Sequence, residues 1–176
     1  AITHMKHPKA ELYSTLEQPF SARGVAGFAD QLETLATQVA AKAPEAQVNE
    51  AYNALKSAIA ATEQGADTSS PKLVGEVIVA LLRTAGEEYA VGVVDGKINN
   101  LHEYQDALGF TKVAGEWARS AAFASSSNAT AAAARIQAML AELDEMWPGL
   151  DPQGEVPHKA AQLYGVAARI EIQILG

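Results

Sequence analysis

The chain has 176 residues, the length of one domain that buries a core without disulfide or metal support. Hydrophobic residues make up 48% of it but aromatic residues only 6%, and this alanine-rich composition favours close-packed helices. The net charge of −8 opposes binding to nucleic acid or anionic lipid and suits cations. The absence of cysteine excludes disulfides, thiol catalysis and Cys-based zinc sites. No apolar run of about 18 residues occurs, so no membrane span is expected.

The first stretch of the chain carries little helical pattern. Residues 1–24 hold a short apolar pattern that Pro8 and Pro19 interrupt, so we expect an arm with one or two helical turns. The opening Ala-Ile-Thr-His-Met fits a mature terminus left by signal-peptide cleavage or a cloning scar. His4 and His7 have the spacing of a helical metal pair, but the terminal position favours a tag or a disordered arm.

Beyond the arm, apolar residues recur at the three- and four-residue steps typical of helices, first over residues 25–42 and then over residues 44–65. Pro44 suits the first position of the second helix. Ser70 and Pro71 then predict the cap and first residue of the most apolar helix, over 72–93. Residues 91–94 are also typical of a short strand. Because no partner strand is evident, we expect a fraying helix end before the following Asp-Gly turn.

The remaining sequence predicts three more helices. The first starts at Asn99 or Asn100 and runs towards Ala124, and Asn128 caps the next, which ends at Trp147. Pro157 opens the last. The residues of the first that we expect to face inward are Leu101, Tyr104, Leu108, Val113 and Trp117.

These elements predict an all-α fold, an antiparallel helical bundle of about five to six helices with a four-helix-bundle-like core. The N-terminal arm occupies residues 1–24, and residues 25–176 form a single helical-bundle domain. The last helix is too short to bury a core of its own, so we expect it to pack on the others.

One end of the predicted bundle gathers charged residues. If helices 72–93 and 101–124 form an antiparallel hairpin, four carboxylates and one imidazole lie at similar heights near its turn. These predicted metal ligands are Glu87, Glu88, His102, Glu103 and Asp106. Helical bundles bind iron or manganese with such ligands, so the cluster is a candidate metal site. No residue is assigned a catalytic role, because no nucleophile elbow, triad or phosphate-binding loop is present.

A structural interpretation of the same residues stays open. Glu103 follows Asn100 by three residues, the spacing of a capping box in which Glu accepts a backbone N–H. The other carboxylates then form a solvated face, and His102 is an exposed residue of a first helical turn. Tyr89 and Tyr104 can supply phenol oxygens, but at helical spacing they are more typical of a core.

Two further metal chemistries receive less support. The Glu-x-x-His pair of di-iron bundles is missing at His102, since residue 99 is Asn, so an enzyme of this type ranks third and no enzyme is expected. A minor second cation site is conceivable around His158 with Asp151 and Glu155, although His158 is most simply a surface residue.

The central hairpin resembles a known family. Its Glu-Tyr-Ala-Val-Gly-Val-Val-Asp-Gly-Lys-Ile-Asn-Asn-Leu-His-Glu-Tyr stretch resembles the soluble extracytoplasmic region of bacterial oxidase-dependent iron permeases, the high-affinity iron transporter family. The resemblance covers about residues 83–147. The matching positions are Tyr89, Val91, Val94, Asp95, Gly96, Ile98, Asn99, Glu103, Tyr104 and Phe110.

This resemblance implies an all-helical, periplasmic or otherwise extracytoplasmic domain associated with iron or another divalent metal ion, with a membrane permease or other uptake protein as partner. Transport by the chain itself is not implied, because the family's Arg-Glu-x-x-Glu motif is absent. The leading hypothesis is therefore a protein that binds or senses metal, most simply iron, for an uptake system. The alternative is a metal-free interaction module that docks on a membrane or soluble partner.

Overall fold

The structure is a computed structural model that describes residues 13–64, 66 and 68–175. This part of the chain contains seven α-helices and one two-stranded antiparallel sheet, which confirms the predicted all-α class. The chain divides into two compact units, Ala1–Ala66 and Asp67–Gly176. This division does not coincide with the expected arm, and whether residues 25–176 form a single domain stays a prediction. The His4/His7 pair lies outside the described residues.

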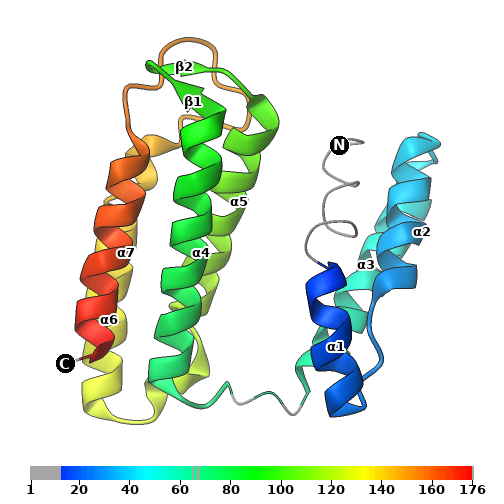
Figure 1. Cartoon of the computed structure of the whole chain (residues 1–176), viewed down its shortest axis with the longest axis horizontal. Helices are drawn as coiled ribbons and strands as arrows, with labels where there is room; N and C mark the ends of the chain where they lie inside the picture. Colours follow the sequence, from blue (N-terminus) through cyan, green and yellow to red (C-terminus); the bar gives the residue numbers. More distant parts are fainter. Residues whose placement is uncertain (1–12, 65, 67, 176) are drawn as a thin grey trace. The chain divides into compact units, whose positions relative to one another are not determined.

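The described part of the first unit is a small helical assembly with a buried cluster of three residues. Its helices are α1 (Ser14–Arg23), α2 (Ala29–Ala40) and α3 (Glu45–Glu63), coloured from blue to cyan in Figure 1. Helices α2 and α3 pack on each other through Leu35, Ala51 and Leu55. Pro44 precedes α3 as its cap residue, one position before the one expected.

Helix α1 is longer than the one or two turns that we expected for the arm. Aromatic residues attach it to the rest of the unit: the ring of Tyr13 lies 6.0 Å from that of Phe20 and 5.0 Å from that of Phe28. At its other end, Arg23 Nη2 donates to the carbonyl of Thr62, at 3.4 Å, and so ties α1 to α3. These contacts between distant residues stabilise α1 despite Pro19 in its middle.

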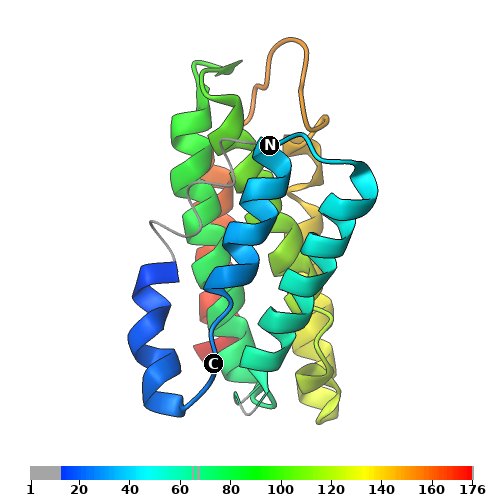
Figure 2. The same ribbon diagram turned by 90° about the vertical axis from the view of Figure 1, so that its right-hand side faces the viewer.

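The second unit is a four-helix bundle, the long helices of which lie side by side in Figure 1. Helix α4 packs against both α5 and α7, and α6 packs against α7. The connection between α4 and α5 and the loop that precedes α7 lie at the same end of the bundle in Figures 1 and 2. The elements are α4 (Pro71–Gly92), β1 (Val93–Val94), β2 (Lys97–Ile98), α5 (Leu101–Trp117), the 3-10 helix η2 (Ala121–Ala124), α6 (Ser127–Ala141), the 3-10 helix η3 (Asp144–Met146) and α7 (Ala160–Leu175).

The end of α4 corrects one prediction and confirms another. Ser70 Oγ accepts from the N–H of Leu73, so the predicted cap is confirmed. The expected fraying helix end is wrong, because β1 and β2 pair as a hairpin. Asp95 and Gly96 have φ values of 51° and 72°, and positive φ at both positions is the geometry of the two-residue turns that match strand twist. Strands of two residues are too short to leave a periodic signal in the sequence.

Three helix boundaries differ from those expected. Helix α5 ends at Trp117 rather than near Ala124, because Ser120 starts a separate 3-10 turn. The cap of α6 is Ser126 and not Asn128, since Ser126 Oγ accepts from the N–H of Ala129. Helix α6 also ends at Ala141, and η3 occupies part of the stretch up to Trp147.

The last helix starts later than Pro157. Gln162 Oε1 accepts from the N–H of Lys159 at 3.0 Å, so a side chain near the start of α7 satisfies a free N–H, as in a capping box. This contact fixes the first turn after Lys159, and α7 begins at Ala160.

Alanine, rather than valine, fills the inner face of α5. Val113, which we expected to face inward, is 40% exposed, and that expectation is wrong. Ala107, Ala114 and the cap residue Ala118 are fully buried instead, small side chains that allow neighbouring helices to pack closely. Tyr104 and Leu108 are buried as predicted.

Candidate cation site at the end of the α4/α5 hairpin

The predicted antiparallel pairing of α4 and α5 is present, and its closest point lies beside the charged residues. A Cβ atom on Gly92 would lie 2.5 Å from the backbone nitrogen of Tyr104, so the two helices are almost in backbone contact there. Gly92 is therefore required by a close approach rather than by a turn. This approach places the last turns of α4 next to the first turns of α5, where the predicted ligands lie.

Carboxylates from the two helices meet at this point. Glu88 on α4 is half-buried, and burial is the largest cause that raises the pKa of its carboxyl to about 7. A hydrogen bond with Glu103 raises that pKa further, as do the charges of Glu103, Asp106 and Glu87. A hydrogen bond between two carboxyl groups needs a shared proton, so Glu88 and Glu103 form an acid pair with excess negative charge around it.

Glu103 also belongs to the start of α5. Asn100 Oδ1 accepts from the N–H of His102 at 3.1 Å, which makes Asn100 the helix cap. Its side-chain Nδ2 donates to Glu103 Oε1 at 3.3 Å. The predicted capping box is not formed, because the backbone N–H of Asn100 donates to the carbonyl of Gly92 at 3.1 Å instead of to Glu103. Glu103 accepts from the Asn100 side chain, and the same carboxyl interacts with Glu88.

The other predicted ligands lie around this pair. Glu87 is exposed on α4, and His102 and Asp106 are half-buried on successive turns of α5. In the described ranges, no three His, Asp or Glu side chains form a group that could hold a metal ion as they stand. This holds for Asp151, Glu155 and His158 as it does for the hairpin residues, so the minor second site also stays a prediction. The assignment of the five hairpin residues as metal ligands stays a prediction.

An aromatic cluster beneath the acid pair holds the loop that precedes α7. The rings of Tyr89, Tyr104 and Trp147 lie 5.5 to 6.3 Å apart. Tyr104 Oη donates to the carbonyl of Gly149 at 2.9 Å, and Tyr89 Oη donates to that of His158. Both tyrosines are buried, and burial raises the pKa of Tyr89 to about 12. They are core residues and not cation ligands.

The loop has two further attachments that the sequence did not reveal. Val156 is fully buried, and its N–H donates to the carbonyl of Gly96 in the hairpin turn at 2.7 Å. Gln105 Nε2 donates to the carbonyl of Leu150 at 2.8 Å. The loop thus crosses the end of the bundle that carries the carboxylates. The sequence offered only the apolar residues Trp147, Leu150 and Val156 in a stretch rich in Pro and Gly, and these do not predict which of them is buried.

A groove of about 510 Å³ opens between α5 and α6, away from the acid pair. Its charged lining includes Lys112, Glu116, Arg119 and Asp144. Trp147 borders it, and its Nε1 is a buried donor without a hydrogen-bond partner in the structure. Because its lining includes both positively charged side chains and carboxylates, the charge of the groove does not favour either anionic or cationic ligands.

The described residues include no helix that is both long and apolar enough to cross a membrane. No curated protein and no solved structure matches the chain significantly. A family model does match, over residues 62–175, and its description is an iron permease-associated 4-helix bundle domain. The match extends beyond the stretch of resemblance expected from the sequence and includes the second unit up to residue 175. Because it spans well over half of the sequence, the chain belongs to the family of iron permease-associated 4-helix bundle domains.

Proposed function

We propose that this protein takes part in iron uptake and that the acid pair of Glu88 and Glu103 binds the metal cation. Two observations support the proposal. The family is associated with iron permeases. The observation that carries it is the convergence of carboxylates from α4 and α5: burial, and after it the neighbouring Glu103, Asp106 and Glu87, raise the pKa of Glu88 to about 7.

The chemistry follows from the crowding of negative charge. A divalent cation that replaces the shared proton of Glu88 and Glu103 relieves the repulsion between them, and the charges of Glu87 and Asp106 add to the attraction. Carboxylate oxygens suit iron and manganese, which also accept water ligands. Since residues 13–64, 66 and 68–175 place no third ligand beside the pair, the cation keeps several waters, or Asp106 and His102 rotate towards it. Such a site fits sensing or transient binding better than permanent storage.

Calorimetric titration of the chelator-treated protein with ferrous, ferric, manganous, zinc and cupric ions tests the proposal. Saturable binding is expected for the wild type and is expected to disappear in the double variant Glu88→Gln/Glu103→Gln. Glu116→Gln is the matched control, because it removes a carboxylate from another face of α5. Binding that survives in the double variant, or no binding by the wild type, sinks the metal proposal and favours the metal-free interaction module.

We also propose that the domain works outside the cytoplasm beside a membrane permease. The support is the family association alone. Fractionation of cells that produce the chain with its native flanking sequence tests this location, and recovery in the cytoplasm contradicts it.

A further inference from the structure

Helices α4 and α5 each carry a second apolar stripe besides the one that faces the core. On α4 the core stripe includes Ile78 and Leu82, both fully buried. A second stripe runs through Val77 and Leu81 to Glu88, at steps of four and seven residues. A surface helix of a bundle needs only one apolar face, so the second stripe requires another explanation.

The matching stripe on α5 follows the same repeat. Glu103, Asp106, Phe110, Val113 and Trp117 are separated by alternating steps of three and four residues, as are residues that face a partner helix in a coiled coil. The side chains of this stripe meet the α4 stripe at Glu88. Besides burial, the hydrogen bond with Glu103 and the charges of Glu103 and Asp106 raise the pKa of the Glu88 carboxyl.

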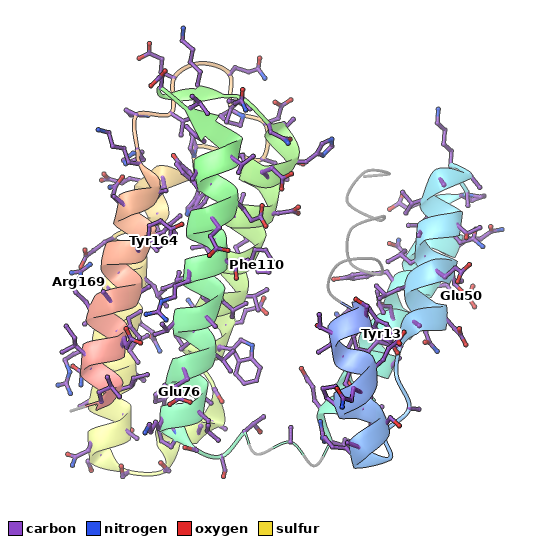
Figure 3. The ribbon with its side chains drawn as sticks, in the orientation of Figure 1. Tyr13, Glu50, Glu76, Phe110, Tyr164 and Arg169 are labelled. Atoms are coloured by element: carbon purple, nitrogen blue, oxygen red, sulfur yellow. The ribbon has the colours of Figure 1, made fainter. Side chains whose placement is uncertain are left out.

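Antiparallel pairing extends this contact along the hairpin. Moving from Glu88 towards the start of α4 corresponds to moving from Asp106 towards the end of α5. Leu81 lies seven residues before Glu88 and Val113 seven after Asp106, so Leu81 is level with the turn from Phe110 to Val113. By the same count Val77 is level with Trp117. Phe110 is labelled on α5 in Figure 3, where this helix runs beside α4. We call the surface formed by Val77, Leu81, Phe110, Val113 and Trp117 the hairpin face.

The hairpin face is partly open to solvent. Val77 is 38% and Val113 40% exposed. Leu81, Phe110 and Trp117 are half-buried and rest on the core, so the face is a firm apolar surface. None of its residues is charged. Leu73, 42% exposed, continues it towards the start of α4.

Charge identifies the partner that fits this face. The apolar part ends at Glu88, Glu103 and Asp106, and the crowding of these carboxylates favours a positive charge beside them. We propose that the hairpin face docks an amphipathic helix of a partner protein, with apolar residues at three- and four-residue spacing and Lys or Arg at the end beside Glu88. Apolar contacts supply the affinity, and the basic end sets the orientation. This inference does not depend on cation binding.

Binding of synthetic helical peptides of about 18 residues, ~27 Å long, tests this docking in chelator with the full chain. Three peptides share one leucine stripe and carry three Arg, three Gln or three Glu at one end. Fluorescence of the tryptophans reports binding, because Trp117 lies on the face. The Arg peptide is expected to bind at least about tenfold more tightly than the Glu peptide.

Variants locate the binding. Val113→Arg and, separately, Val77→Arg are expected to weaken the Arg peptide by about tenfold or more, with unchanged circular dichroism. Ile172→Arg is the control, since Ile172 is an exposed apolar residue on α7. Glu88→Gln/Asp106→Asn is expected to bring the Arg and Glu peptides within about threefold of each other.

Several results overturn the inference. One is the absence of binding by every peptide, and another is equal affinity for the Arg and Glu peptides. Full affinity in both arginine variants places the binding elsewhere. Binding to phosphatidylcholine vesicles that Val113→Arg abolishes, without peptide binding, identifies a lipid surface instead. A dimer in sedimentation velocity that Val113→Arg dissociates identifies a second copy as the occupant.

Discussion

The two units of the chain build their cores differently. In the second unit, one continuous cluster includes large side chains that are fully buried, such as Tyr89, Tyr104 and Ile78. Among the described residues of the first unit, the buried cluster consists of Leu35, Ala51 and Leu55, and the apolar residues packed against it are partly exposed. Since buried apolar area supplies most of the stability of a fold, the second unit has the larger share. The family match, which includes the second unit up to residue 175 but little of the first, follows the same division.

The largest effect is expected from removing core side chains in the two units. Leu82 is 0% exposed and Leu55 is 7% exposed. Leu82→Ala should cost about 4 kcal/mol of unfolding free energy and weaken amide protection throughout the second unit. Leu55→Ala should cost about 2 kcal/mol and affect only amides of the first unit. Hydrogen exchange measured by mass spectrometry checks both. Equal loss of protection in both units for either variant contradicts the comparison.

A second contrast concerns two glycines with close neighbours. Gly92→Ala should cost about 3 kcal/mol, because the added methyl group would meet the backbone nitrogen of Tyr104, which cannot move alone. In Gly27→Ala in the first unit, the added methyl group meets the hydroxyl end of the Tyr13 side chain, which has to shift within its contacts with Phe20 and Phe28. We expect a cost of about 1 kcal/mol there, because a side chain and not the backbone moves. Urea denaturation of both variants measures the difference, and similar costs would refute this account of α4 and α5.

A smaller effect is expected at the loop that crosses the bundle end. Tyr104→Phe removes the donor to the carbonyl of Gly149 but keeps the ring between Tyr89 and Trp147. The expected cost is about 1 kcal/mol, with faster exchange at amides of residues 149–156. Tyr164→Phe, on an exposed part of α7, serves as control. Unchanged exchange in the loop would show that packing alone holds it.

The smallest effect concerns pH. The pKa of Glu88 is raised from 4.5 to about 7 in the folded protein, so the folded state binds more protons than the unfolded state between these values. Its contribution to stability is therefore lost as pH rises through this window. Because the carboxyl is partly exposed, the loss should be about 1 kcal/mol or less. Glu88→Gln should flatten this dependence in thermal melts at pH 5 to 8, whereas Glu116→Gln should retain it. An unchanged slope in Glu88→Gln rules out this carboxyl as the cause.

Periodic patterns predicted most of the helices but not their ends. Ser70 and Pro71 placed the start of α4 correctly, because a cap and a helix-starting proline act within one turn. Ser126 and Ser120 were missed, since several residues in a serine-rich stretch can cap a helix and only packing selects among them. The β1/β2 hairpin was missed because strands of two residues leave no periodic signal, although its Asp-Gly turn was visible.

The sequence by itself determined that the chain is helical, that α4 and α5 form an antiparallel hairpin, and that acidic residues gather at its turn. Helix period and the order of residues are local properties, and they place Glu88 and Glu103 on facing turns. Only the tertiary structure decided that these two carboxyls share a hydrogen bond, that alanines line the inner face of α5 and that Val113 faces outward. These features depend on the distance between two helix axes, which is set where Gly92 meets Tyr104 and by contacts between residues far apart in the chain.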